Sequence, residues 1–550
     1  MERRLLLAIV LMVAILVVPS LFMKPSRRPL VRADTSAAGP QASRAAAESA
    51  AVAAAPAPAI RSAPAPAPTL IEDTVTLATP HAVFRLGSIG ATVAQAELPD
   101  YRSFHRGDRG AVRLVPSGDR LLVHRLVVGN DTVRLDSVPF VIEERGPAVR
   151  MQGRAGTVTE RLTVAPVAAN PYLLDVDGQL DGLEGRGALL VVGLGRGFAN
   201  VESDSNDNYR RYAVAVRRTT PENYNFRSVD SGVVKEVPGP FDWVAVKSKY
   251  FMGVLLSADS TRPQFGGAVL IGEPRSGRVA TLMQTWVTLP VGPDARFHYR
   301  LYVGPQEHRI LHPMGRELDR ASPYGWIFKP IVMPVATWIT QIFVWMHQNA
   351  GIGYGWVLVV FGILVRLVLW PLNQRAMKSQ VAMMALQPIL QDIQKRYKSD
   401  PAKLQQETMK AYREHHVNPF GGCLPMLLPM PVLLALFFVF ANTIELRGTP
   451  FLWLPDLSLR DPLLVTPLVM GLSMFALSKL SQLGMPPNPQ AKMMTYFMPI
   501  MMTVMFLNFA SGLNLYYAVS NLVSLPQQFL INKARREEMA RRQVPTRKST

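Results

Sequence analysis

The stretch that decides the fold is YGWVLVVFGILVRLVLWPL, residues 354–372. As a helix with a rise of ~1.5 Å per residue, it is long enough to cross the hydrocarbon core of a bilayer. Its single charge is Arg366, about 18 Å from Tyr354 and about 9 Å from Leu372 along the helix. Because an arginine at the centre of a membrane helix costs roughly 2.5–3.5 kcal/mol, the pattern predicts that Arg366 lies in a polar cavity.

The alternative is that Arg366 extends its side chain to the nearer membrane face. Side chains on a helix point toward its N-terminus, which here leads deeper into the membrane and away from that face. The direction of the side chain therefore favours the cavity.

Other apolar segments predict further membrane helices, at residues 5–23, 420–441, 462–480, 493–509 and 513–531. Together with 354–372 they make six predicted spans. The first follows MERR and could be a cleaved signal peptide, but its length and the lack of an A-x-A site close behind it favour a retained anchor over residues 1–23. The segment from 24 to 69 is rich in Ala and Pro and is predicted to be a disordered linker.

The sequence pattern changes over residues 70–320. Short alternating segments such as 81–86, 120–128 and 296–303 are separated by turn residues, which predicts a β-sandwich. The predicted fold is a polytopic α-helical membrane protein with six transmembrane helices, five of them forming a core over residues 321–533, and an exported β-sandwich domain. A carbohydrate-active site built from dispersed carboxylates stays open as an alternative for the sandwich.

The charge pattern predicts the orientation. The chain has 59 Lys and Arg against 40 Asp and Glu, a net charge of +19. Basic residues gather in the loop 374–419 and in the tail 534–550, so the positive-inside rule places both in the cytoplasm. The number of spans then puts both termini in the cytoplasm and the β-sandwich outside. Such a charge balance favours anionic partners, either lipid headgroups or nucleic acid.

The loop 374–419 is itself predicted to be a helical hairpin. Asp400 followed by Pro401 is typical of a helix start, with the aspartate as N-cap. No nucleophile elbow and no His-Glu-x-x-His occurs, and the lone Cys423 excludes a cysteine-based zinc site. The sequence therefore predicts no catalytic residue, metal or cofactor, and a protein that is not an enzyme.

The last apolar segment carries a polar stripe on one helix face. Its five members are spaced 3, 4, 3 and 4 residues apart, namely Asn514, Tyr517, Asn521, Ser524 and Gln528. A membrane helix turns such a stripe toward protein or water rather than lipid. Interhelical hydrogen bonding would explain it equally well when it is taken alone. Taken with Arg366 and Asn373, it favours a shared hydrated groove, whose predicted lining is Arg366, Asn373, Asn514, Tyr517, Asn521, Ser524 and Gln528.

Three motifs resemble signatures of the YidC family of membrane protein insertases: VNPFGGCLP at 417–425, Gln-Pro at 387–388 and SGLNLYYAVSN at 511–521. The resemblance covers residues 326–533 strongly. It implies a bacterial inner-membrane insertase and chaperone with a periplasmic β-sandwich and a hydrophilic groove that contains Arg366. Two prolines, Pro429 and Pro526, depart from the pattern of that family.

The resemblance also implies partners, namely nascent membrane protein clients and the Sec translocon. The basic tail and cytoplasmic loops add the ribosome and anionic lipids. A client's apolar segment is expected to leave between helices 420–441 and 493–509, touching Met430, Leu434, Phe437 and Met505.

Two other functions remain. A secondary transporter would also place a charge and a polar stripe in mid-membrane, but the paired repeats of that class are not found. An anchored periplasmic sugar-binding protein would explain the sandwich and give the helices no role.

Overall fold

A computed structural model describes residues 72–543, apart from 184, 260–261, 276–278, 323–328, 416–429 and 484–488. The predicted anchor at 1–23 and the linker at 24–69 lie outside the described residues, as does the end of the tail at 544–550.

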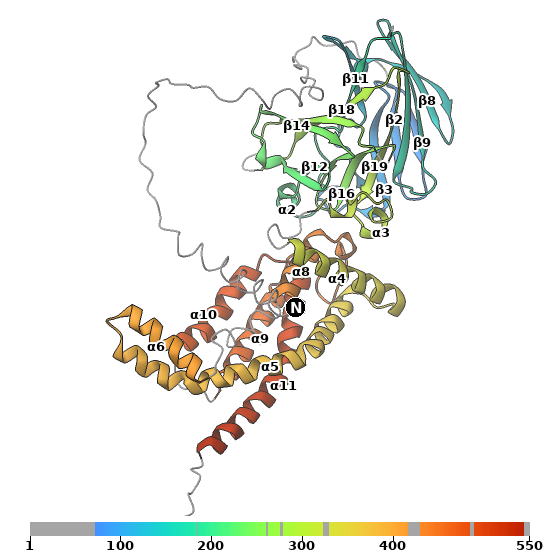
Figure 1. Ribbon diagram of the computed structural model, residues 1–550. Helices are drawn as coiled ribbons and strands as arrows, with labels where there is room; N and C mark the ends of the chain where they lie inside the picture. The colour runs from blue at the N-terminus through green and yellow to red at the C-terminus, as the bar shows by residue number, and fades with distance from the viewer. Residues whose placement is uncertain are drawn as a thin grey trace, which may run out of the picture. The chain divides into compact units, whose positions relative to one another are not determined.

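The first half of the described chain is built from antiparallel strands (Figure 1). A four-stranded sheet has the order β1-β2-β3-β4, with bounds Thr74–Ala78, Val83–Gly87, Thr92–Arg102 and Ala111–Arg113. A six-stranded sheet has the order β14-β17-β18-β11-β5-β6, formed by Val234–Phe241, Phe265–Gly272, Met283–Val291, Ala188–Gly193, Val123–Val128 and Asp131–Arg134.

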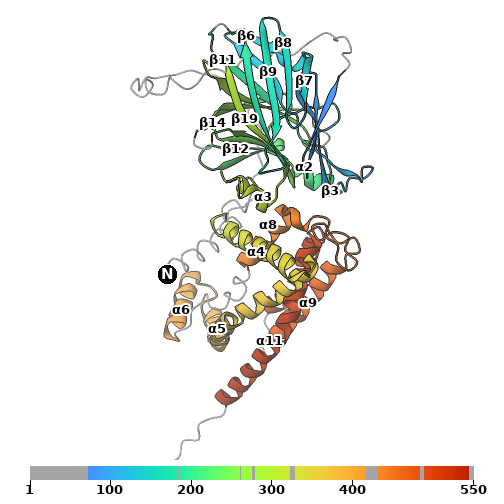
Figure 2. The ribbon, with the colours of Figure 1, turned by 90° about the vertical axis from the view of Figure 1, so that its right-hand side faces the viewer.

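The largest sheet has nine strands in the order β13-β12-β15-β16-β19-β10-β9-β8-β7 (Figure 2). Their bounds in that order are Pro221–Asn225, Ala213–Arg217, Trp243–Lys247, Phe251–Ser257, Arg296–Pro305, Leu173–Asp181, Val158–Pro166, Val149–Ala155 and Phe140–Arg145. We call residues 72–305 the β-domain.

Burial alternates along these strands, as two-residue periodicity requires. In β9, Val158, Glu160, Leu162 and Val164 are buried while the residues between them are not. A buried polar contact crosses between the two larger sheets: the ring nitrogens of His124 on β5 lie 2.6 Å from Glu160 Oε1 on β9 and 2.6 Å from Tyr299 Oη on β19. The predicted β-sandwich is confirmed.

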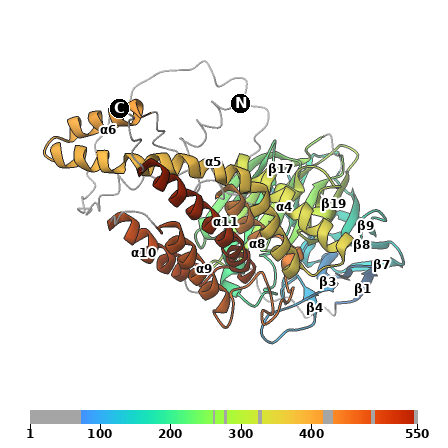
Figure 3. The same ribbon diagram turned by 90° about the horizontal axis from the view of Figure 1, so that it is seen from below.

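The second half is helical (Figure 3). Its helices are α4 Lys329–Ala350, α5 Tyr354–Arg396, α6 Pro401–Glu414, α8 Met430–Asn442, α9 Val465–Ser481, α10 Pro489–Phe506 and α11 Ser511–Gln543. The predicted cap of α6 is confirmed, because Asp400 accepts a hydrogen bond from the backbone of Lys403 at 3.1 Å. The predicted membrane segment 354–372 and the first part of the predicted hairpin 374–419 join in one helix, α5, which runs through Pro371 and Pro388.

Among the described residues, one helical segment, Tyr354–Leu372, is both long and apolar enough to cross a membrane. Shorter apolar helices are found at Met430–Asn442, Val465–Ser481 and Thr495–Phe506. The other five predicted spans therefore stay predictions. One of them, 5–23, and the first part of another, 420–429, lie outside the described residues.

The segment between α8 and α9 contacts the β-domain through Arg447. Its Nε lies 2.9 and 3.0 Å from the two carboxylate oxygens of Glu202, and only 4% and 8% of the two side chains are exposed. The guanidinium also lies over the ring of Phe104, 4.6 Å from its centroid. An ion pair so fully buried is strongly coupled, because either charge alone would be left without water or a partner.

Candidate functional site

The site is built around Arg366, which α5 carries within its membrane-length segment. The side chain is half-buried, and its Nε donates a hydrogen bond to Ser520 Oγ on α11 at 2.7 Å. Tyr516 and Tyr517 of α11 also lie close to it. Among the described side chains, no carboxylate pairs with Arg366. The positive charge of Arg366 is therefore not neutralised by these neighbours and can attract an anionic group.

Close packing of α5 on α11 creates this contact. Gly362 lies one turn before Arg366, and a β-carbon added there would be 3.3 Å from Val519 Cγ1 and 3.6 Å from Tyr516 Cδ2. The small residue therefore lets the two helices approach. Asn373 also lies in α5, but its side chain is outside the described residues.

The start of α11 is fixed by the motif SGLN. The backbone of Gly512 donates to Leu457 O at 3.0 Å, and Ser511 Oγ donates to Asp456 O at 3.2 Å. A β-carbon on Gly512 would lie 2.3 Å from Phe440 Cε1 of α8, so only glycine fits this crossing. These contacts set the rotation of α11 and hence the direction of each polar side chain along it.

Three members of the predicted stripe lie between α11 and its neighbours. Asn514 Nδ2 donates to the carbonyl of Phe506 at the end of α10, at 3.2 Å. Asn521 Nδ2 donates to Ser473 Oγ of α9, also at 3.2 Å. The ring of Tyr517 packs edge-on against Phe506 at 5.2 Å. These contacts match the interhelical hydrogen bonding that the sequence left open beside the groove.

The other two members bond within their own helix. Ser524 Oγ donates to the carbonyl of Ser520 at 2.6 Å, and Gln528 Nε2 donates to Asn532 Oδ1 at 3.4 Å. Pro526 lies between them, and α11 continues through it. The structure thus brings Arg366 to the stripe's edge at Ser520.

Sequence reasoning missed Ser520, the direct partner of Arg366. Its position in the sequence could have indicated it, because Ser520 lies one residue before Asn521 and four before Ser524 and so borders the predicted polar face.

Two buried polar atoms near the stripe have no hydrogen-bond partner among the described residues. They are Asn514 Oδ1 and Gln527 Nε2. Buried polar atoms in native proteins are nearly always paired, with ordered water filling the remaining needs. Their presence along α11 indicates a region with places for water or for a polar ligand.

The predicted apolar contact residues are spread over two helices. Met430, Leu434 and Phe437 on α8 are half-buried, with the ring of Phe437 5.5 Å from that of Phe509. Met505 on α10 is 45% exposed. α10 presents further exposed apolar side chains, which suit contact with lipid or an apolar segment: Tyr496, Phe497, Ile500, Met501 and Val504.

The chain matches two family models that together cover both halves. Residues 74–346 match the model described as the YidC periplasmic domain, and residues 345–538 match the model described as 60Kd inner membrane protein. A membrane protein insertase YidC from Chlorobium limicola is 30% identical over 564 residues, which cover 97% of this chain and 95% of the relative. One from Chlorobaculum tepidum is 30% identical over 577 residues, with the same shares of each chain.

A solved structure described as an active YidC insertase with its first transmembrane domain resolved aligns with 84% of this chain and 93% of its own, at 18% identity and a TM-score of 0.34. The two relatives match nearly end to end, across the β-domain and the helices alike. The chain therefore belongs to the YidC family of membrane protein insertases.

Proposed function

We propose that the helical core inserts membrane proteins by receiving the polar flank of a client beside Arg366. The observation that carries this proposal is a cation inside a membrane-length helix that has a hydroxyl partner and, among the described side chains, no carboxylate partner. An acidic client tail supplies the missing anion. Its attraction to Arg366 is strengthened because fewer water molecules screen it there than at the surface.

The energetic problem that the site solves is desolvation. Moving an amide or hydroxyl into an apolar medium without a hydrogen bond costs roughly 2–7 kcal/mol. A hydrated groove reaching from the cytoplasm to Arg366 shortens the apolar path of the client's flank. The proposed lining is Arg366, Asn373, Asn514, Tyr517, Asn521, Ser524 and Gln528, to which the contact with Ser520 adds a further member.

The apolar segment of the client leaves toward lipid between α8 and α10. The half-buried side chains of Met430, Leu434 and Phe437 and the exposed Met505 support this path. Methionine and phenylalanine fit clients of varied sequence, since a flexible thioether adapts its shape to different apolar partners. No covalent step, nucleotide or metal takes part in this mechanism.

The proposed orientation keeps both termini in the cytoplasm and the β-domain in the periplasm. The proposed partners are nascent membrane proteins, the Sec translocon, ribosomes and anionic lipids. Surface charge on α6 supports contact with anionic surfaces, since Lys403 and Lys410 are largely exposed.

The test compares two clients that differ only in the charge of the translocated tail, acidic or neutral. Vesicles carry the unaltered protein, Arg366→Lys or Arg366→Ala at equal levels, and protease protection of the tail reports insertion. Arg366→Ala is expected to reduce insertion of the acidic client roughly 10- to 100-fold, the effect of losing about 1.5–3 kcal/mol of charged hydrogen bonding. Arg366→Lys keeps the charge and loses the planar fork, so it retains part of the activity.

The control is Arg150→Ala, which removes a largely exposed cation from the β-domain and should leave both clients unaffected. Equal losses of both clients with Arg366→Ala would show that Arg366 maintains structure or hydration instead of attracting acidic tails. Full activity of Arg366→Ala with both clients would reject any role of this residue in insertion.

A further inference from the structure

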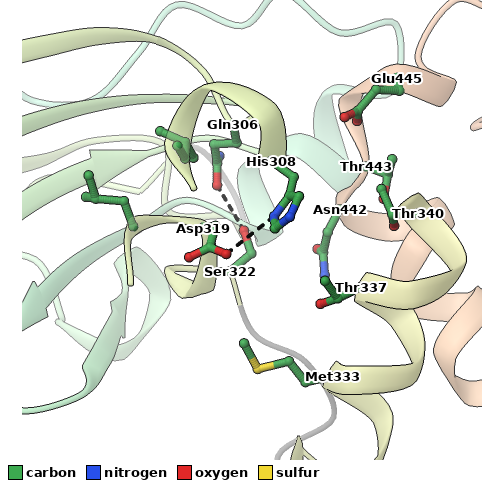
Figure 4. Close-up of a pocket in the computed structure, with 12 residues that line it drawn as sticks. Gln306, His308, Asp319, Ser322, Met333, Thr337, Thr340, Asn442, Thr443 and Glu445 are labelled. Carbon is green, nitrogen blue, oxygen red and sulfur yellow. Dashed lines mark hydrogen bonds and ion pairs between the residues drawn. The ribbon is translucent and has the colours of Figure 1, made fainter. Parts of the chain in front are cut away.

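Two histidines and an aspartate come together in the segment that links the β-domain to α4. His308 opens the short helix α3 (His308–Leu311), and His312 follows it one turn later. The 3-10 turn η3 (Leu318–Arg320) brings Asp319 back to them. Asp319 Oδ2 lies 3.3 Å from His308 Nδ1 and 3.2 Å from His312 Nδ1 (Figure 4 shows the first contact).

The spacing of these atoms fits a tetrahedral metal ion. The two rings face each other at an angle of 31°, with centroids 4.9 Å apart, and one ligand atom from each of the three residues lies within 4.8 Å of the others. For bonds of about 2.0–2.1 Å, the edge of a tetrahedral coordination shell is roughly 3.3–3.4 Å. The two nitrogen–oxygen distances are therefore close to those that Zn²⁺ would impose.

We infer that His308, His312 and Asp319 form a binding site for Zn²⁺ or a similar divalent transition metal ion. Two imidazoles and one carboxylate are ligands that zinc accepts readily, whereas Mg²⁺ and Ca²⁺ prefer oxygen ligands throughout. The sequence offers a signal for this site in the i, i+4 pair His308 and His312, but Asp319 lies seven residues farther on and joins them only through the turn.

The arginines next to the cluster pair with carboxylates other than Asp319. Arg309 lies 2.7 Å from Glu307, and Arg320 lies 2.5 Å from Glu317.

The site has room for a fourth, solvent ligand. A cavity of ≈ 40 Å³ is lined by His308, Asp319, Gln306 and Ser322, among others. A water molecule needs roughly 10–15 Å³ of such space, so a metal-bound water fits beside His308 and Asp319. The bound ion would hold η3 against α3 and so stiffen the segment before α4.

A second cluster of the same residue types serves as an internal control. His298 lies 2.9 Å from Asp175 and 3.9 Å from Asp177 on the nine-stranded sheet. Here Arg300 Nε also lies 3.1 Å from Asp175, so the guanidinium already pairs with the carboxylate that a metal ion would need. This cluster is not expected to bind zinc.

The experiment uses the full chain in lipid nanodiscs, purified without a histidine tag because a tag binds the same metals. Zn²⁺ binding is measured by calorimetry, and Co²⁺ serves as a spectroscopic probe of tetrahedral coordination. The unaltered protein should bind one ion at this site. His312→Ala and Asp319→Asn should each lower its affinity at least roughly 100-fold, since loss of even an outer partner costs roughly 10–100-fold.

His298→Ala should bind zinc like the unaltered protein. His312 is 69% exposed, so its replacement removes a ligand with little change in packing. Hydrogen exchange gives a second measurement: Zn²⁺ should slow exchange over residues 308–320 in the unaltered protein and not in His312→Ala. Undiminished binding by His312→Ala, an octahedral Co²⁺ spectrum, or loss of binding in His298→Ala would overturn the inference.

Discussion

Arg366 and Ser520 join α5 to α11 through a hydrogen bond of 2.7 Å from the guanidinium Nε to the serine hydroxyl. The two residues are 154 positions apart in the sequence. The bond uses the Nε of the guanidinium and leaves the terminal nitrogens to face other groups. The bond thus orients these terminal nitrogens, which we propose bind an acidic client tail.

Removing the hydroxyl should weaken the orientation of Arg366 while its charge remains. Ser520→Ala is expected to slow insertion about 3- to 10-fold, matching roughly 0.5–1.5 kcal/mol for one hydrogen bond, and to keep the preference for acidic tails. Ser520→Thr should restore the rate. Ser228→Ala is the control, because its hydroxyl donates to the nearby carbonyl of Asn225 on the exposed surface of the β-domain. Unchanged insertion with Ser520→Ala would mean that Arg366 needs no such support.

The bond from Asn521 to Ser473 is expected to stabilise the packing of α11 on α9. Both side chains are buried, and their polar atoms are 3.2 Å apart. In a double-mutant cycle with Asn521→Ala and Ser473→Ala, unfolding in detergent should show a coupling free energy of about 0.6 kcal/mol, the average for such pairs in membrane proteins. A coupling of zero would favour contact of Asn521 with water or client in place of the interhelical role.

Breaking the buried ion pair at Arg447 should destabilise the protein strongly. Arg447→Ala leaves Glu202 buried without its partner, which costs about 3–5 kcal/mol of unfolding free energy. Thermal unfolding measures this loss. Arg150→Ala is the control, since the pair of Arg150 with Glu144 is largely exposed and should contribute less than about 1 kcal/mol.

The same variant should respond to pH. Burial raises the pKa of Glu202 even though Arg447 acts to lower it. Without Arg447 the pKa rises further, so the folded state binds a proton that the unfolded state has lost. Stability of Arg447→Ala should therefore fall as the pH rises above the unfolded pKa of the carboxyl group, and acid should restore part of it. Equal stability at acidic and neutral pH would contradict this assignment.

Two buried lysines, Lys247 and Lys249, differ in how their surroundings affect the pKa of the side chain. Burial lowers the pKa of Lys247 to about 7, and nearby Arg211 lowers it too. Burial alone would also lower the pKa of Lys249, but Tyr250 and Asp207 outweigh it, and its ammonium lies 2.9 Å from Asp207. The first lysine therefore opposes folding at neutral pH, and the second is held by its partner.

Between about pH 7 and the ordinary lysine value of 10.5, the unfolded state binds more protons at Lys247 than the folded state. The contribution of Lys247 to stability should therefore increase as the pH rises through this window. Lys247→Met should remove that increase and stabilise the protein at pH about 7, whereas Lys249→Met should destabilise it. Thermal unfolding across the window is the measurement. An unchanged pH slope in Lys247→Met would show that other groups produce it.

The basic tail should recruit ribosomes through phosphate contacts. Removing residues 535–550 is expected to reduce ribosome co-sedimentation at low salt, and added salt should weaken the binding of the intact protein steeply. A tail of the same length with its Lys and Arg residues replaced by Gln separates charge from length. If ribosomes bind equally after truncation, the tail serves to fix topology on anionic lipid.

Local patterns in the sequence determined the elements themselves. Alternation over 70–320 predicted the sandwich because a sheet buried on one face requires period two. Asp400 before Pro401 predicted the start of α6 because capping depends on a few consecutive residues. The apolar stretch 354–372 predicted a membrane-length helix, since hydrocarbon thickness alone sets the required length.

The partners of individual side chains depended on tertiary packing. Ser520 and Asn521 are adjacent, yet the first bonds Arg366 on α5 and the second bonds Ser473 on α9. A helix turns about 100° per residue, so the rotation of α11 chooses between these contacts, and docking of Gly512 on α8 sets that rotation.

The same holds for Arg447, which meets Glu202 from 245 residues away, and for Asp319, which reaches His308 and His312 through a turn. Composition and periodicity specify which face of an element is buried. They do not specify which distant element covers it, because that choice comes from the combined packing of many side chains.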